Sequence, residues 1–226
     1  MRRQNPNMPA VELAAAALGD LTKELVLVGG CAVGLLITDA AIPPIRSTRD
    51  VDLLTEVAPL ASYYLLGDRL RDRGFTESQE LTCRWIRGAL IIDVMPTEER
   101  VLGFTNQWYE GAAKTAVDFE LPSGARIRLI SAPYFLATKV ESFRSRGGGD
   151  FLHHDVEDIV TLVDGRPELL DEVTGANEDV KSFIRSSFED LVLEQAFLDV
   201  LAWHFEESEQ GRVPIVLDRL RRLGGL

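Results

Sequence analysis

Two aspartates at alternate positions, Asp50 and Asp52, follow the glycine pair Gly29 and Gly30 by about twenty residues. The segment that carries them is β-prone, and successive side chains of a strand point to opposite faces, so we expect both carboxylates on one face and their apolar neighbours on the other. Two adjacent carboxylates destabilise each other, and a bound divalent metal ion relieves that repulsion. A carboxylate pair beside a glycine bend therefore predicts a site for a magnesium nucleotide.

The glycine pair stands between an apolar, β-prone run over residues 25–28 and an apolar, helix-compatible stretch over residues 31–37. In such a strand-turn-helix segment, glycine lets the backbone approach phosphate oxygens, and the positive end of the following helix favours their charge. A glycine pair at the end of a strand is also common as a plain tight turn. The spaced aspartates, rather than the glycines alone, make phosphate binding the better prediction.

A third acidic residue, Asp93, interrupts the strongly apolar run over residues 89–95. This run is expected to pair with residues 82–87 across Gly88 as a hairpin or as two adjoining strands. A buried carboxylate is costly without a partner. Asp93 is therefore expected either to form a structural ion pair or to complete the site.

Taken together, these motifs resemble the DNA polymerase β-like nucleotidyltransferases. The resemblance rests on the glycine pair, the Arg-x-Thr-x-Asp-Val-Asp-Leu run over residues 46–53, Asp93 in a strand, Lys139 in a helix, and Asp155-x-x-Asp158. More narrowly, the chain resembles the AbiEii/AbiGii toxin family of nucleotidyltransferases, which occur as the toxin halves of toxin-antitoxin pairs. The resemblance covers about residues 25–165, and the run over residues 46–53 is its most specific part.

The resemblance implies transfer of NMP from an NTP to an acceptor hydroxyl, with two Mg²⁺ ions held by Asp50, Asp52 and Asp93. In this reaction a hydroxyl attacks the α-phosphate and pyrophosphate leaves, so catalysis requires in-line positioning and neutralisation of phosphate charge. Carboxylate oxygens are suitable hard ligands for the two ions. Asp93 would serve the side of the nucleophile and accept the hydroxyl proton.

Four charged residues and the glycine pair are expected to bind the nucleotide. Gly29 and Gly30 would admit the β- and γ-phosphates, and Lys139 would contact the triphosphate. Arg46 or Arg49 would share that contact or pair with the aspartates. Asp155 would orient the lysine or touch the nucleotide, although an acidic residue at a helix start is favoured by the helix dipole in any case.

The net charge limits the choice of acceptor. The 226 residues carry 36 acidic and 24 basic side chains, a formal net charge of −12. Proteins that hold a nucleic-acid backbone usually present excess Lys and Arg, because counterion release supplies much of the affinity. An RNA acceptor would therefore need a local patch, for which Arg126, Arg128, Arg144 and Arg146 are the candidates.

The sequence shows neither a membrane span nor a disulfide framework. No stretch of about 18 residues is uninterruptedly apolar. The two cysteines, Cys31 and Cys83, lie far apart and are expected to be reduced thiols, which favours a cytoplasmic location.

The predicted fold class is α+β: a polymerase β-like nucleotidyltransferase domain over residues 1–130, with a small mixed sheet and flanking helices, then a helical carboxy-terminal domain over residues 131–226. Strands are expected at 25–28, 51–55, 82–87, 89–95, 117–121 and 126–130, and helices at 9–18, 31–40, 59–74, 131–143, 153–165, 178–205 and 213–223. Residues 144–150 are expected to form a basic loop. His153 and His154 are expected to be a solvated pair, because adjacent helical residues point about 100° apart and cannot easily share a metal ion.

Three functions remain open. The leading one is a Mg²⁺-dependent nucleotidyltransferase acting as the toxin of a type IV-like toxin-antitoxin system, with the tRNA 3′ end as acceptor and an antitoxin protein as partner. The second keeps the chemistry and changes the acceptor to a small-molecule or protein hydroxyl. The third is a nucleotide-binding module without turnover, which the set of three crowded carboxylates disfavours.

Overall fold

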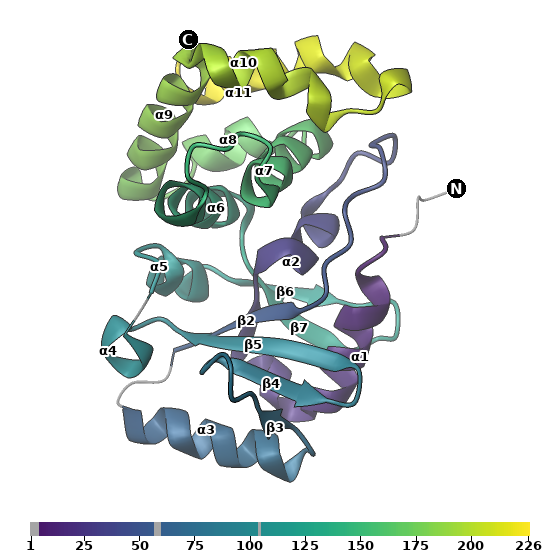
Figure 1. The fold of residues 1–226 in the computed structure, drawn as a ribbon, viewed down its shortest axis with the longest axis vertical. Coiled ribbons are helices and arrows are strands. Elements are labelled where there is room, and N and C mark those ends of the chain that lie inside the picture. The colour runs from purple at the N-terminus through teal and green to yellow at the C-terminus, as the bar shows by residue number, and fades with distance from the viewer. Residues whose placement is uncertain (1–4, 57–59, 104) are drawn as a thin grey trace. The chain divides into compact units, whose positions relative to one another are not determined.

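The computed structural model describes residues 5–56, 60–103 and 105–226, which divide into two compact units. We call residues 5–35 and 46–131 the sheet unit, and residues 36–45 and 132–226 the helical unit. Figure 1 labels the elements of both units along the chain. Residue 59, the first of a predicted helix, lies outside the described residues.

The sheet unit contains a seven-stranded mixed sheet in the order β3-β4-β5-β2-β1-β7-β6. Figure 1 labels six of these strands, all but β1. The strands are β1 (Leu25–Leu27), β2 (Val51–Thr55), β3 (Thr76–Glu77), β4 (Arg84–Arg87), β5 (Leu90–Pro96), β6 (Val117–Glu120) and β7 (Arg126–Leu129). β1 pairs with β7, and β2 with β5, in parallel, and the other neighbouring strands are antiparallel. This architecture confirms the predicted fold class, and the short edge strand β3 was not predicted.

The central strands are buried, as their apolar sequences predict. All three residues of β1 are buried, and in β5 both Ile92 and Val94 are fully inaccessible to solvent. In β2, Val51 and Leu53 are 1% and 5% exposed. A charged side chain on these strands therefore lies on a rigid, close-packed support.

Five helices belong to the described part of the sheet unit, apart from the last residue of α2. They are α1 (Met8–Leu18), α2 (Gly29–Leu36), α3 (Leu60–Asp72), α4 (Glu99–Leu102) and α5 (Tyr109–Lys114), and a 3₁₀ turn, Gly19–Lys23, follows α1. The helix predicted over residues 31–40 thus begins earlier, with the glycine pair as its first two residues, and ends earlier, at Leu36. α3 packs on the sheet, since the Tyr63 hydroxyl donates a hydrogen bond of 2.8 Å to the carbonyl oxygen of Val94 on β5.

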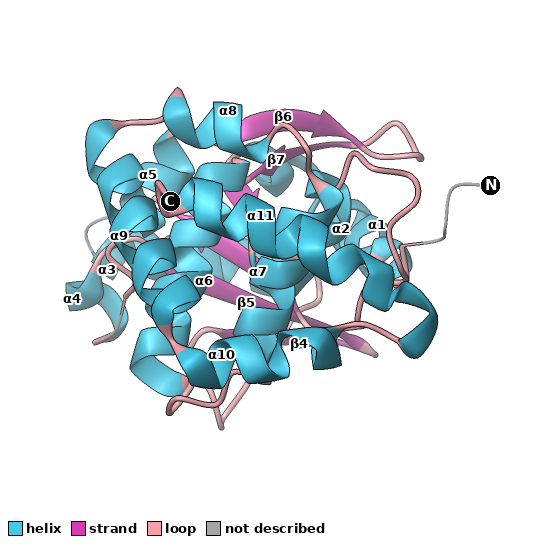
Figure 2. Ribbon diagram, turned by 90° about the horizontal axis from the view of Figure 1, so that it is seen from above, coloured by secondary structure: helices cyan, strands magenta, loops and turns pink. Residues whose placement is uncertain are grey.

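The described residues of the helical unit form helices and loops and no strand, whereas the strands of Figure 2 all belong to the sheet unit. Its helices are α6 (Ala132–Arg146), α7 (His154–Gly165), α8 (Leu169–Thr174), α9 (Glu178–Leu193), α10 (Gln195–Val200) and α11 (Val213–Leu223), with 3₁₀ turns at Leu201–His204 and Glu207–Arg212. The prediction of a basic loop from Arg144 was wrong at its start, because α6 continues to Arg146. The single helix predicted over residues 178–205 breaks at Glu194, whose backbone is extended and whose side chain caps α10 by accepting from the Ala196 N–H.

Two further observations concern the whole chain. Cys31 and Cys83 are both buried and are not joined in a disulfide, and the Cys31 thiol donates a hydrogen bond of 3.3 Å to the Asp50 carbonyl. Within the described residues, no helix combines the length and the apolar character that crossing a bilayer requires.

Candidate functional site

Parallel pairing of β2 and β5 places Asp52 and Asp93 side by side, because their Cα atoms are register partners. The side chains of register partners point to the same face of a sheet. Asp50 lies immediately before β2, two residues from Asp52, and so shares that face. Within the sheet unit, the three predicted carboxylates are therefore brought together.

Arg84 on β4 joins two of these carboxylates. Its Nε donates to Asp93 Oδ1 at 2.8 Å, and its Nη2 donates to Asp93 Oδ2 at 2.7 Å and to Asp50 Oδ2 at 2.6 Å. The hydrogen bond to Asp93 outweighs the opposing effect of burial and raises the pKa of Arg84 above its ordinary value. The guanidinium therefore stays charged at any pH at which the protein is folded.

Sequence reasoning missed Arg84, although a signal for it exists. The β4–β5 hairpin turns between Arg87 and Leu90, which are register partners, and stepping outward from that turn brings Arg84 opposite Asp93. The pairing of Arg84 with Asp93 could therefore have been predicted from the hairpin, by following its register residue by residue from the turn.

The glycine bend lies against Asp52. The backbone N–H of Val28 donates to the Asp52 carbonyl at 2.9 Å, and Gly29 has a φ of +65°. A Cβ at Gly29 would lie 1.8 Å from Asp52 Oδ2, and a Cβ at Gly30 would lie 2.6 Å from Arg46 Nη2. Only glycine fits at either position while these two side chains keep their places.

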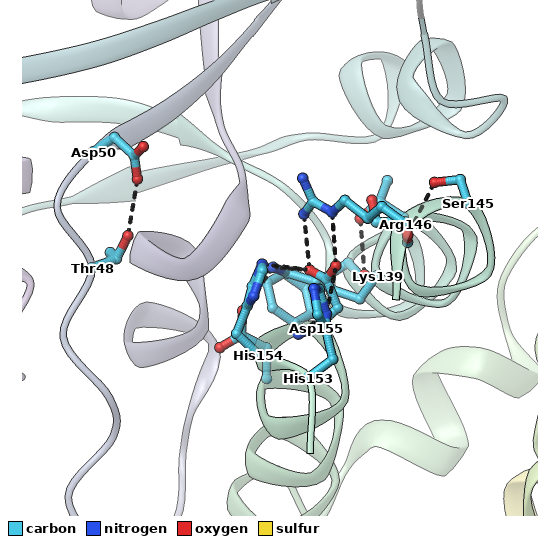
Figure 3. Close-up of polar contacts among 12 residues, drawn as sticks. Thr48, Asp50, Lys139, Ser145, Arg146, His153, His154 and Asp155 are labelled. Carbon is cyan, nitrogen blue, oxygen red and sulfur yellow. Dashed lines mark hydrogen bonds and ion pairs between the residues drawn. The ribbon is translucent and has the colours of Figure 1, made fainter. Parts of the chain in front are cut away.

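A buried amide fixes the segment that leads to Asp50. Asn7, 2% exposed, donates through Nδ2 to the Arg46 carbonyl at 3.1 Å, and its Oδ1 accepts from the Thr48 N–H at 2.9 Å. Thr48 Oγ1 in turn donates to Asp50 Oδ1 at 3.1 Å (Figure 3). Asn7 was not predicted, because its partners are about forty residues away and no local pattern marks it. Arg49, the other predicted arginine, is exposed.

Lys139 and Asp155 belong to the helical unit, where they contact each other. Lys139 Nζ lies 2.9 Å from Asp155 Oδ1 and 2.7 Å from Asp158 Oδ2, and its side chain is 7% exposed. Arg146 adds hydrogen bonds of 3.0 and 3.1 Å to the two oxygens of Asp155 (Figure 3). The lysine is therefore neutralised within a buried cluster rather than solvated on a helix surface.

The pKa values of this cluster reflect competition between burial and charge. Burial alone would raise the pKa of Asp155, but Lys139 and Arg146 outweigh it and lower the pKa to about 2. Burial alone would lower the pKa of Lys139, but Asp158 and Asp155 outweigh it and raise the pKa. Both groups are thus ionised at neutral pH.

His153 and His154 depart from the predicted geometry. His153 is the N-cap of α7, with a φ of −58° and a ψ of 143°, and its Nδ1 accepts from the Asp155 N–H at 3.2 Å. Because it is not helical, its ring lies 3.9 Å from that of His154, centroid to centroid, and the two histidines and Asp155 offer ligand atoms within 4.8 Å of one another (Figure 3). The prediction that these rings diverge was wrong. Two cations, Lys139 and Arg146, already contact the carboxylate of this trio, which disfavours a metal ion there.

All four arginines of the suggested RNA patch have acidic partners. The ion pairs are Arg126–Glu120, Arg128–Glu56 and Arg144–Asp190, each at 3.6 Å, and Arg146–Asp155 at 3.0 Å. The first two belong to the sheet unit and the last two to the helical unit.

The fold is that of nucleotidyltransferase-like proteins. Neither a protein-family model nor a curated protein matches the chain by sequence. Among solved structures, the chain is similar to an antigenic nucleotidyltransferase-like protein from Paracoccidioides brasiliensis, with a TM-score of 0.53 and 19% identity, covering 84% of this chain and 89% of that one. It is also similar to the antibiotic-resistance factor ANT(2'')-Ia, with a TM-score of 0.50 and 15% identity, covering 88% and 100% of the two chains. At these identities the similarity establishes the fold.

Proposed function

We propose that the protein is a Mg²⁺-dependent nucleotidyltransferase that moves NMP from an NTP to an acceptor hydroxyl. The observation that carries this proposal is the pairing of Asp52 with Asp93 on adjacent strands, beside Asp50 and against the bend at Gly29. The nucleotidyltransferase-like fold supports the same reaction.

The donor set suits magnesium. Carboxylate oxygens are the hard ligands that Mg²⁺ prefers, and three carboxylates on one face can hold two ions. Asp50, Asp52 and Asp93 would hold them, and the bound ions would neutralise charge on the phosphate oxygens and lower the pKa of the acceptor hydroxyl.

The surrounding residues would bind and orient the nucleotide. Gly29 and Gly30 keep side chains away from the backbone at the start of α2, where the helix dipole favours the β- and γ-phosphates. The guanidinium of Arg46 lies over Gly30 and would face a phosphate bound there, while the exposed Arg49 could add a second charge. Because Asn7 holds the backbone of the Arg46 segment, that cation is positioned before the nucleotide binds.

In the helical unit, Lys139 and Asp155 are the residues proposed to bind the nucleotide. The Nζ of Lys139 contacts both Asp155 and Asp158. Its contribution to phosphate binding therefore requires at least one of these contacts to exchange for a phosphate oxygen.

For the acceptor, two candidates stand on different observations. The resemblance to the AbiEii/AbiGii family supports the tRNA 3′ end, in a toxin that an antitoxin protein counters. The net charge of −12 and the acidic partners of all four candidate arginines favour a small-molecule or protein hydroxyl instead. The fold similarity to an antibiotic-resistance factor supports the small-molecule alternative.

Incubation of the protein with each α-³²P-labelled NTP and Mg²⁺ tests the proposal directly. Total tRNA, a small-molecule extract and a protein extract are supplied in separate reactions, and the fraction that becomes labelled identifies the acceptor class. If none of the fractions becomes labelled with any of the four NTPs, the result would contradict the proposal and favour a nucleotide-binding module without turnover.

The matched variants are Asp52→Asn and Asp118→Asn. Asp118 is an exposed aspartate on β6 of the same sheet. We expect Asp52→Asn to lower transfer at least about 100-fold, since it removes a ligand charge, and Asp118→Asn to leave it unchanged. Equal transfer by Asp52→Asn and the unsubstituted protein would refute the metal platform.

A further inference from the structure

We propose that Arg84 is a positioning residue that acts as an internal counter-charge: its guanidinium holds Asp50 and Asp93 in place and competes with a divalent ion for their oxygens. This inference rests on the proposed function, and it concerns a residue that neither the motif nor the resemblance marks.

The first support is the geometry of the contacts. Arg84 makes three hydrogen bonds of 2.6–2.8 Å to the two carboxylates, and both oxygens of Asp93 are used. These are the atoms that would bind the metal. A carboxylate oxygen that faces a guanidinium N–H at this distance must turn away, or share its remaining lone pair, to bind an ion.

The second support is charge. Three carboxylates on one face repel one another, and one guanidinium offsets a single negative charge. A divalent ion at the same carboxylates would lie a few ångströms from that guanidinium, where like charges repel strongly because the site is only partly solvated. Metal binding must therefore displace the guanidinium at least in part.

The geometry also indicates which contact gives way. Asp50 receives one hydrogen bond from Arg84 and its side chain is 28% exposed, whereas Asp93 receives two and is 11% exposed. The bidentate pair with Asp93 is the stronger of the two. We therefore expect the Asp50 contact to open first, which frees Asp50 Oδ2 while Arg84 stays on β4 beside Asp93.

An ion pair that merely ties β4 to β5 predicts something different. Its removal would lower stability by the same amount with or without divalent ions. A counter-charge predicts that the loss of stability depends on divalent ions. Without Arg84 the carboxylates repel one another, and a bound divalent ion restores the positive charge that the guanidinium supplied.

The test measures Mn²⁺ binding by electron paramagnetic resonance on the full chain, without nucleotide or acceptor. The variants are Arg84→Gln and, as a control, Arg87→Gln. Arg87 lies on the same strand, but its guanidinium lies over the Phe75 ring, 6.0 Å from the ring centroid. We expect Arg84→Gln to bind Mn²⁺ about tenfold more tightly than the unsubstituted protein, and Arg87→Gln to bind as the unsubstituted protein does. Thermal unfolding should show that Mn²⁺ raises the midpoint of Arg84→Gln more than that of either other form.

Equal or weaker Mn²⁺ binding by Arg84→Gln would overturn the inference. If that variant does not fold, ¹⁵N NMR of the Arg84 Nη2–H in the unsubstituted protein replaces it, because Nη2 makes the contact to Asp50 that is expected to open. Mg²⁺ should shift this resonance, and an unchanged resonance at saturating Mg²⁺ would also overturn the inference. Because ion binding is measured without NTP, the outcomes separate. Tighter Mn²⁺ binding by Arg84→Gln, with no transfer of label by the unsubstituted protein, would refute the proposed function alone. Transfer of label, with no change in Mn²⁺ binding by Arg84→Gln, would refute the role of Arg84 alone.

Discussion

Gly29 packs directly against the carboxylate of Asp52, a contact that the sequence motif alone does not reveal. Its φ of +65° is a conformation that L side chains rarely adopt, and Asp52 Oδ2 takes the space where a Cβ would project. Two separate penalties therefore act against any side chain at this position.

The two penalties can be measured apart with Gly29→Ala and Gly124→Ala. Gly124 has a φ of +85°, and nothing lies within 4 Å of the position that a Cβ would take, so its substitution carries only the backbone penalty, about 1 kcal/mol. We expect Gly29→Ala to cost roughly 1–3 kcal/mol more in urea unfolding, because Asp52 must move, and to lose Mn²⁺ binding. Equal losses of stability in the two variants, with metal binding intact, would contradict the close packing of Gly29 against Asp52.

At this scale the sequence was informative where neighbours in the chain are neighbours in space. Strand alternation alone predicted that Asp50 and Asp52 share a face, and the order of strand and helix along the chain predicted the place of the glycine pair. Arg84 required the register of a hairpin, and Asn7 required the path of a segment about forty residues away. Long-range contacts of single polar residues leave no local pattern.

Between elements, Lys139 links α6 to α7 of the helical unit through two buried ion pairs. We expect Lys139→Met to destabilise the protein by about 3–5 kcal/mol, because Asp155 and Asp158, 0% and 1% exposed, would lose their buried cation. Lys181→Met is the control, since Lys181 pairs with Glu178 on the surface of α9, where such a pair contributes at most about 1 kcal/mol. A loss below about 1 kcal/mol for Lys139→Met in urea unfolding would contradict this account of the cluster.

The same link predicts a pH dependence. Asp155 has a folded pKa of about 2, below the unfolded value of about 3.9, so its stabilisation is complete above about pH 4 and is lost as the pH falls towards 2. Urea unfolding from pH 5 to pH 2 should show a stability difference between the unsubstituted protein and Asp155→Asn that shrinks by roughly 2–3 kcal/mol. A difference that stays constant across this range would show that the carboxylate titrates normally.

Element types were largely predictable, and element ends were predictable only for some elements. Hydrophobic periodicity placed β2 at residues 51–55 and α11 at residues 213–223, as the structure has them. The break at Glu194 and the N-cap role of His153 depend on capping within the folded unit, which periodicity does not register. The false prediction of diverging histidine rings followed from treating His153 as helical.

For the molecule as a whole, net charge governs contact with nucleic acid. With a formal charge of −12 and an acidic partner at each candidate arginine, we expect an RNA footprint of about two phosphates or fewer. Fluorescence anisotropy of labelled tRNA should then give a slope of log K against log salt no steeper than about −2. A slope of about −5 would reveal an extended basic surface and favour a large RNA acceptor.

The mixture of strands followed by helices was predictable because its signals are local: a strand-turn-helix, two hairpins, and a switch to helices after residue 130. The nucleotidyltransferase fold itself was predicted from the family resemblance. The order β5-β2-β1-β7 in the sheet centre was not, since parallel pairs form through long connections whose path depends on packing. That order nevertheless puts Asp93 beside Asp52, which the motifs alone could only suggest.

The most direct test of the central claim is anomalous diffraction from crystals soaked with Mn²⁺ and a non-hydrolysable NTP analogue. We expect anomalous peaks about 2 Å from carboxylate oxygens of Asp50, Asp52 and Asp93, with the triphosphate at the bend of Gly29. A peak at His153, His154 and Asp155 instead, with none at the three aspartates, would contradict it.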